Sequence, residues 1–178
     1  GGDYGRDDAV LNIEETGATI TRDATTGYGH NCYGWYADLI VSGGSHGQLK
    51  IYNKNGEEVA SLIGHTGEVL SIALDGDRLV SGSGDQTIKV WDLSAIKNSQ
   101  FKAKEYNEEM IILGMKQLNI SRENAIKYAL DNNINIYKTP EIHPLLSLFV
   151  GSDNEWVMWD NNGFFDASDN GAKYIGYH

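Results

Sequence analysis

The stretch from Gly64 to Leu93 limits the possible folds of this chain more than any other part of the sequence. Apolar and polar residues alternate along it with the period of two that half-buried strands show. Two triplets that contain glycine and aspartate interrupt the alternation, and they favour tight turns because glycine reaches positive φ. The stretch therefore predicts strands at 68–74, 78–83 and 87–91, joined by turns at 75–77 and 84–86.

The ends of this stretch are as informative as its interior. It begins with Gly64-His65 and ends with Trp91-Asp92-Leu93, and in this respect it resembles a repeat of the WD-repeat family of β-propellers. The resemblance implies that a histidine, a strand serine, a turn aspartate and the tryptophan form a hydrogen-bonded set inside one blade. In this sequence the matching residues are His65, Ser81, Asp85 and Trp91.

A histidine, a serine and an aspartate are also the components of a hydrolytic triad. A triad needs in addition an exposed nucleophile and an oxyanion hole. The resemblance implies a buried network, so we predict that His65, Ser81 and Asp85 stabilise the blade and have no catalytic role.

A second copy of the pattern lies upstream. Residues 39–53 align without a gap on residues 78–92, and 39 residues separate Tyr52 from Trp91. WD repeats recur at about 40–45 residues. In this copy His46 replaces the turn aspartate and Tyr52 replaces the tryptophan, so we expect a degenerate blade.

Two further upstream elements are less regular. Gly29-His30 is the candidate Gly-His pair of the second copy, but His30 precedes Ser42 by 12 residues, whereas His65 precedes Ser81 by 16. Either a loop is shortened here or residues are missing. Residues 9–20 resemble the last part of another blade.

We predict a mainly β fold, a partial WD-repeat β-propeller of antiparallel four-stranded blades with a short helical insertion. Propellers close with about four to eight blades, more than are readable here. We therefore expect further residues of a longer chain to complete the ring, with self-association as the alternative. The predicted segments are the end of an incomplete blade (1–22), a degenerate blade (23–53), a WD blade (54–93), a helical insertion (94–139) and a C-terminal strand and hairpin (140–178).

The helical insertion is predicted from a loss of strand alternation after residue 97. Residues 107–118 can form one helix, and Ser121 is a suitable N-cap for a second helix over 122–130. The insertion could pack against the rim of the propeller, or it could be an arm that docks a partner.

The C-terminal segment predicts an apolar strand at 143–150 and a hairpin formed by 155–159 and 164–168. It resembles the end of the propeller part of bacterial WD-repeat proteins that carry a caspase-like peptidase domain. The resemblance rests on Glu155, Trp156, Val157, Gly163, Phe165, Ala167, Ser168, Gly171, Lys173, Tyr174 and Ile175. The catalytic histidine and cysteine of such a peptidase are not in this sequence.

Composition narrows the possible partners. The formal net charge is −11, which repels phosphate backbones and anionic lipids, so we expect neither nucleic-acid nor membrane binding. No apolar run approaches the roughly 18 residues of a membrane span. The single cysteine, Cys32, is typical of a reducing compartment and predicts a cytoplasmic location.

Other chemical sites are weakly indicated. Asp166, Ser168, Asn170 and Gly171 fit the start of a calcium-binding loop, but its twelfth position would be Tyr177, where a glutamate is needed. Cys32 lacks the sequence context of a caspase-like nucleophile. We therefore predict no metal, no cofactor and no catalytic residue.

The predicted function is a non-catalytic scaffold or sensing propeller that binds proteins of unknown identity. The alternative is the regulatory region of a larger bacterial caspase-like protease. The predicted interaction surface consists of residues near loops. The aromatic residues among them could instead pack in the interior of the fold. These residues are Tyr33, Trp35, His46 and Arg78.

Overall fold

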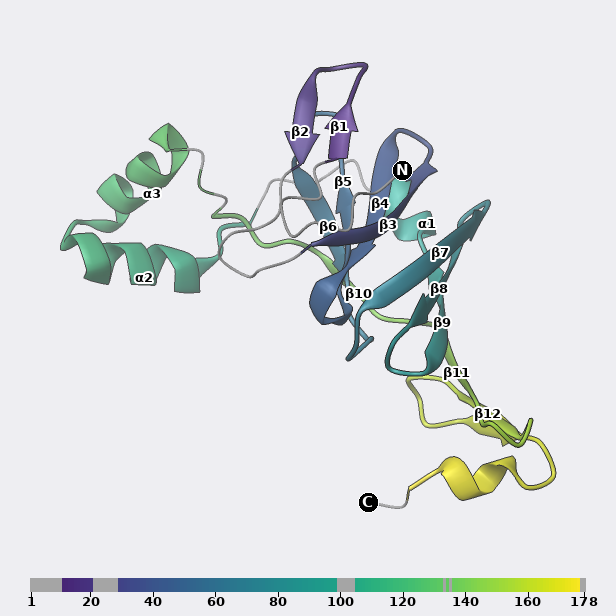
Figure 1. The fold of residues 1–178 in the computed structure, drawn as a ribbon. Helices are drawn as coiled ribbons and strands as arrows, with labels where there is room; N and C mark the ends of the chain where they lie inside the picture. The colour runs from purple at the N-terminus through teal and green to yellow at the C-terminus, as the bar shows by residue number, and fades with distance from the viewer. Residues whose placement is uncertain (1–10, 21–28, 99–104, 133, 135, 177–178) are drawn as a thin grey trace. The chain divides into compact units, whose positions relative to one another are not determined.

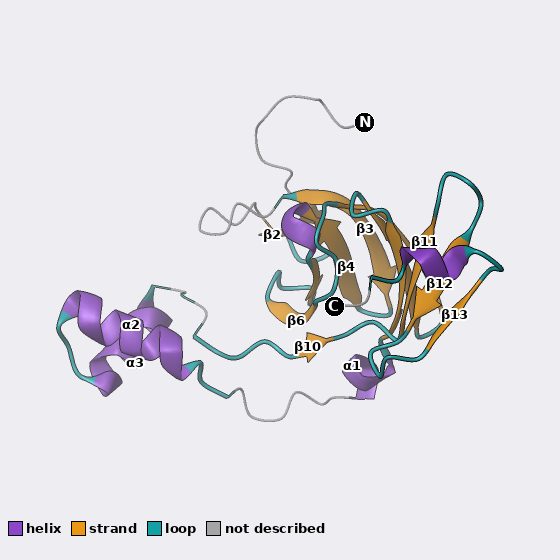
Figure 2. Ribbon diagram, turned by 90° about the horizontal axis from the view of Figure 1, so that it is seen from below, coloured by secondary structure: helices purple, strands orange, loops and turns teal. Residues whose placement is uncertain are grey.

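The computed structural model describes residues 11–20, 29–98, 105–132, 134 and 136–176. Two compact units divide the chain, one formed by 1–98 with 140–178 and the other by 99–139. Figures 1 and 2 show β-sheets in the first unit and a pair of helices in the second. Residues 1–10 and 21–22 of the predicted incomplete blade and residues 23–28 of the predicted degenerate blade lie outside the described residues.

The first sheet has the strand order β10-β6-β5-β4-β3. Neighbouring strands are antiparallel except β10, which lies parallel to β6. A short 3₁₀ turn, η1 (Ser45–Gly47), joins β4 to β5. The strands are β3 (His30–Tyr36), β4 (Leu39–Gly44), β5 (Leu49–Tyr52), β6 (Glu58–Leu62) and β10 (Glu141–Ile142).

The second sheet has the order β13-β12-β11-β9-β8-β7 and is antiparallel throughout. Counted from β7, the fourth strand of this sheet is β11. In the sequence it is separated from β9 by α1 (Ser94–Asn98) and by the helical unit. A 3₁₀ turn, η2 (Gly171–Tyr174), follows the last strand. The strands are β7 (Val69–Asp75), β8 (Arg78–Ser83), β9 (Thr87–Asp92), β11 (Leu146–Val150), β12 (Trp156–Trp159) and β13 (Phe165–Ala167).

A separate two-stranded antiparallel hairpin precedes these sheets. It consists of β1 (Leu11–Ile13) and β2 (Ala18–Ile20). Ile13 and Ile20 of the hairpin are buried together with Ile40 and Tyr52 of the first sheet. The hairpin is therefore held by apolar contacts with β4 and β5, since it is paired with neither strand.

The main core lies between the two sheets. Its buried residues come from one face of each sheet: Val41, Leu49, Ile51, Ala60 and Leu62 from the first, Val69, Leu79 and Trp91 from the second. The sheets approach closely because glycines lie at the contact. A Cβ built on Gly43 would lie 2.6 Å from a methyl group of Val69. Tyr36 adds a polar link, since its hydroxyl lies 2.7 Å from Asp77 Oδ1.

The second unit contains α2 (Glu108–Leu118) and α3 (Arg122–Asp131), which lie side by side in Figure 2. The side chain of Asn107 accepts a hydrogen bond from the Met110 N–H, and Ser121 caps α3 in the same way. Asn119 ends α2 in the left-handed conformation. These helices agree with the predicted ranges to within one residue.

The predicted fold class is confirmed: the chain is mainly β, with antiparallel sheets and a short helical segment. Two details differ from the expectation. Each sheet extends beyond four strands, because β10 pairs with the outer edge of the first sheet and β12 with β13 extends the second. Strand β6, which the sequence division grouped with 54–93, is hydrogen-bonded to β5 and so belongs to the preceding sheet.

Candidate functional site

The structure brings together the four residues implied by the repeat pattern. Asp85 Oδ2 lies 2.8 Å from His65 Nδ1, and His65 Nε2 lies 2.8 Å from Ser81 Oγ. Trp91 Nε1 donates to the same serine oxygen at 2.8 Å. The set joins the segment before β7, strand β8, the β8–β9 turn and strand β9.

Two threonines complete this network, and sequence reasoning did not single them out. The Thr66 N–H donates to Asp85 Oδ2 at 3.0 Å, and the Thr87 hydroxyl donates to Asp85 Oδ1 at 2.6 Å. The Thr87 N–H also donates to that oxygen. Aspartate commonly bonds the backbone two residues ahead, so the Asp85-x-Thr87 spacing was the available signal.

The charge state of the network follows from its burial. Burial lowers the pKa of His65, although Asp85 opposes the shift. Burial also acts to raise the pKa of Asp85, but hydrogen bonds from Thr87, Thr66 and His65 outweigh it and hold the pKa well below its usual range. At neutral pH the stable arrangement is a neutral His65 that donates from Nδ1 to an ionised Asp85 and accepts from Ser81 at Nε2.

This geometry does not suit nucleophilic catalysis. Only 1% of the Ser81 surface is exposed, and Trp91 is fully buried. The serine oxygen already accepts a hydrogen bond from Trp91, so a substrate carbonyl has no approach to it. A nucleophile must reach its substrate at about 3 Å, which this packing prevents.

The first sheet repeats part of the network. His30 Nδ1 lies 2.6 Å from Ser42 Oγ, and the His30 ring contacts Tyr52 edge to face at 5.9 Å. The corresponding distance between the His65 and Trp91 rings is 6.0 Å. The shortened spacing noted in the sequence therefore still allows the histidine–serine contact.

A second repeated feature crosses three strands of each sheet. Ser42, Lys50 and Ser61 are paired in one row of the first sheet, and Ser81, Lys89 and Ser147 in one row of the second. Both lysines are buried. Lys50 pairs with Glu58 at 3.0 Å. Lys89 donates to Ser147 at 2.8 Å and lies over the Trp159 ring. The matching rows identify β11 as the fourth strand of the second blade.

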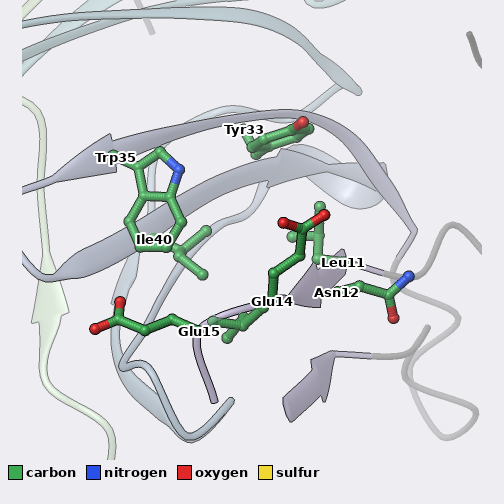
Figure 3. A pocket seen from close by; sticks show the side chains of 8 residues that line it. Leu11, Asn12, Glu14, Glu15, Tyr33, Trp35 and Ile40 are labelled. Atoms are coloured by element: carbon green, nitrogen blue, oxygen red, sulfur yellow. The ribbon is translucent and has the colours of Figure 1, made fainter. Parts of the chain in front are cut away.

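Two of the predicted interaction residues lie at a pocket of about 360 Å³ between the β1–β2 hairpin and strand β3. Tyr33 and Trp35 are 63% and 52% exposed. Figure 3 shows both rings along β3, with Glu14 and Glu15 of the hairpin turn facing the same space. Tyr36, from the same aromatic stretch, is instead buried in the main core.

The other two predicted interaction residues are not brought together. His46 is exposed in η1, whose neighbour Gly47 lies against the His65 carbonyl. Arg78 is the first residue of β8 in the second sheet. There its Nη1 lies 3.3 Å from Asp92 Oδ2. The four residues therefore do not form one continuous surface.

The suggested calcium loop is used for other contacts. Ser168 and Asn170 both bond to the Glu155 carboxylate, and Asp166 is paired with Met158 in the β12–β13 ladder. Among the described residues, no cluster of three or more histidine, cysteine or acidic side chains could hold a metal ion. Within the same residues, no helix has the length and apolar character needed to cross a membrane.

Comparison with known proteins identifies the repeat. Residues 56–92 match the family described as "WD domain, G-beta repeat". This segment is therefore similar to a WD repeat. The match includes Ser81, Asp85 and Trp91 and ends at Asp92, while His65 lies near its beginning. The matched segment therefore covers the hydrogen-bonded network described above.

Two relatives match longer parts of the chain than the repeat alone. The chain is 25% identical over 147 residues to the ribosome biogenesis protein YTM1 of Eremothecium gossypii, which covers 74% of this chain and 33% of that protein. It is 31% identical over 116 residues to WD repeat-containing protein 1 of Xenopus tropicalis, covering 58% and 19%. The chain thus spans a third or less of these relatives.

Solved structures with a similar arrangement include the mitotic checkpoint complex, with a TM-score of 0.41 and 15% identity over 92% of this chain and 44% of the matched chain. An active polycomb repressive complex 2 in the basal state matches with a TM-score of 0.39 and 27% identity, over 42% and 17%.

Proposed function

We propose that the chain is a non-catalytic protein-interaction scaffold that forms part of a WD-repeat propeller. The observation that carries the proposal is the use of His65, Ser81 and Asp85 inside a buried network, which leaves this triad-like set without access to substrate. Propeller repeats present loops and strand faces to protein partners. The matched WD repeat supports this function.

An exposed apolar sheet face supports the further proposal that the ring is completed by other blades. Alternate residues of β7–β9 point to opposite faces, and the face with Leu79 and Trp91 is covered by the first sheet. The opposite face exposes Val80, Ile88 and Val150. Exposed apolar patches of this kind mark interaction sites. We propose further residues of a longer polypeptide as the covering blade, with a second copy as the alternative.

A photo-crosslinker at position 88 tests this scaffold proposal in the intact protein. Because Ile88 lies on the uncovered face, we expect covalent adducts with protein segments outside residues 1–178, located by mass spectrometry. A crosslinker at the exposed Asp38, in the β3–β4 turn, is the matched control. A folded protein in which position 88 gives no more adducts than position 38 would contradict the proposal.

The finer alternatives remain predictions. The resemblance of the C-terminal hairpin to bacterial caspase-like proteases rests on the sequence of 155–175, and neither the WD repeat nor the relatives named above test it. A cytoplasmic location, based on Cys32 alone, stays a prediction in the same way. Labelling with a fluorophosphonate tests the absence of serine catalysis, and we expect no adduct at Ser81.

A further inference from the structure

Helix α2 carries more apolar side chains than α3 covers. Six of its eleven residues are apolar, and among these only Ile111 is buried. A helix that is apolar on several faces is normally packed on several faces. The composition of α2 therefore indicates that a further element covers it. The six residues are Met110, Ile111, Ile112, Leu113, Met115 and Leu118.

The uncovered surface forms a groove of about 270 Å³ between α2, α3 and the segment that follows α3. Ala125 and Ala129 line it from α3 and are buried. Several larger apolar side chains that line the groove are exposed to solvent, which is unusual for side chains of this size. These are Met110, Leu113, Leu118, Tyr128 and Ile134.

A glycine in the middle of α2 keeps this groove open. Gly114 lies within the helix and its φ is not positive, so the backbone does not require glycine there. Of the described residues, only Ala125 would lie within 4 Å of a Cβ at this position, at 3.9 Å, an ordinary contact. Glycine inside a helix costs about 1 kcal/mol relative to alanine. Gly114 therefore has no role in the fold of the unit that alanine could not fill, but it leaves space in the groove.

We propose that this groove is the interface of a homodimer in which the α2 helices of two copies pack antiparallel about a two-fold axis. The α2 side of the groove is one stripe with the i, i+3, i+4, i+7 spacing of a helix–helix seam. When two such stripes cross between residues 113 and 114, Leu113 of each copy lies opposite Gly114 of the other. A large side chain then enters the space beside the glycine at two symmetric places. The stripe consists of Met110, Leu113, Gly114 and Gln117.

The charges beside the stripe favour a second copy with this direction. Glu109 precedes Leu113 by four residues and Lys116 follows it by three, so both border the stripe on the same side. Both are exposed. In an antiparallel pair, Glu109 of one copy lies beside Lys116 of the other, and the contact occurs twice. A parallel pair would place like charges together. The dimer goes beyond the scaffold proposal, because it uses the helical unit and not the sheet face that exposes Ile88.

The mass of the intact protein in solution tests this inference. Light scattering and sedimentation over a range of concentrations should show a reversible dimer, with twice the mass of one polypeptide. Leu113→Lys should raise the dissociation constant of the dimer by at least about tenfold, because it places a charge in the seam. Ile112→Lys is the matched control, since Ile112 is 47% exposed against 49% for Leu113 and does not line the groove. It should leave the dimer unchanged.

Gly114→Ala separates the interface from the stability of the helix. Alanine favours the helix, so the unfolding midpoint of the helical unit should not fall. The added methyl groups occupy the space that Leu113 enters, so the dimer should weaken by about tenfold. A weaker dimer together with an equally or more stable helix is the result that a purely structural role of Gly114 would not produce.

Reversal of charge tests the direction of the two helices. Glu109→Lys and Lys116→Glu should each weaken the dimer, and the double variant should regain the affinity of the parent protein. A double variant weaker than either single variant would contradict the antiparallel arrangement. A protein that stays monomeric, a dimer that L113K and I112K affect equally, or a different protein bound in the groove would overturn the proposal.

Discussion

At the scale of single residues, Ser81 links two other members of the buried network. Its hydroxyl satisfies both Trp91 Nε1 and His65 Nε2 in a fully buried position. Ser81→Ala leaves both groups without a partner, and a buried unsatisfied group costs about 1–3 kcal/mol. We expect the midpoint of urea unfolding to fall accordingly. Ser71→Ala, on the exposed side of β7, should change stability by less than about 0.5 kcal/mol. Equal effects would contradict this role.

The same network predicts an acid-sensitive fold. The pKa values of His65 and Asp85 are both lower in the folded chain than their ordinary values, so the unfolded chain binds more protons. Stability should therefore be complete above the unfolded pKa of histidine, about 6.5, and decline as pH falls below it. Asp85 adds a further loss below about pH 4. Unfolding measured from pH 8 to pH 2 tests both parts of this prediction.

His65→Gln is the matched variant for that measurement, because glutamine cannot titrate in this range. It should be less stable at neutral pH, yet its stability should change less than that of the parent chain between about pH 6.5 and 5. An unchanged pH profile would assign the acid sensitivity to other groups.

At the scale of elements, the η1 turn fixes how closely the two sheets approach. Gly47 has a φ of 75°, and a Cβ at this position would overlap the His65 backbone carbonyl. Gly47→Ala should therefore force the sheets apart and cost well over about 1 kcal/mol. Gly76 also has positive φ, but nothing lies within 4 Å of a Cβ there. Gly76→Ala should show the conformational cost alone, and similar losses in both variants would contradict the packing argument.

Some elements of this fold can be predicted from the sequence and others cannot. Strands β7, β8 and β9 follow from local alternation and turn residues, and helix α3 from its Ser121 cap. The pairing of β11 with β9 could not be predicted from local pattern, because more than 50 residues separate the two strands. The contact of Lys89 with Ser147, which marks this pairing, forms only in the folded sheet. The two-residue strand β10 is too short to show any alternation.

The candidate interaction residues illustrate the same limit. Tyr33 and Trp35 are recognisable in sequence as unusual aromatics, but their meaning depends on the register that equates them with Ile72 and Leu74. His46 and Arg78 were grouped with them because all lie near loops, whereas the structure places His46 in η1 of the first sheet and Arg78 at the start of β8 in the second. Pairing register, which no local pattern encodes, decides both outcomes.

At the scale of the whole molecule, the helical unit interrupts a blade between its third and fourth strands. Its own ends are paired, since the Lys138 N–H donates to the Glu105 carbonyl at 2.7 Å and the Asn107 N–H to the Ile136 carbonyl at 2.8 Å. Strand β11 meanwhile bonds along β9 over four residue pairs. Each unit therefore has internal hydrogen bonds of its own.

Replacement of 99–139 by a flexible glycine–serine linker should accordingly leave the sheets folded. The cost of closing a loop changes slowly with its length, by about 0.6 kcal/mol per doubling, while the β9–β11 ladder and the buried contact of Lys89 with Ser147 remain. Hydrogen exchange is the appropriate measurement, and we expect amides of β9 and β11 to keep their protection. If protection disappeared from β11 alone, the fourth strand would depend on the helices, and the unit would be part of the blade's folding rather than an insertion into it.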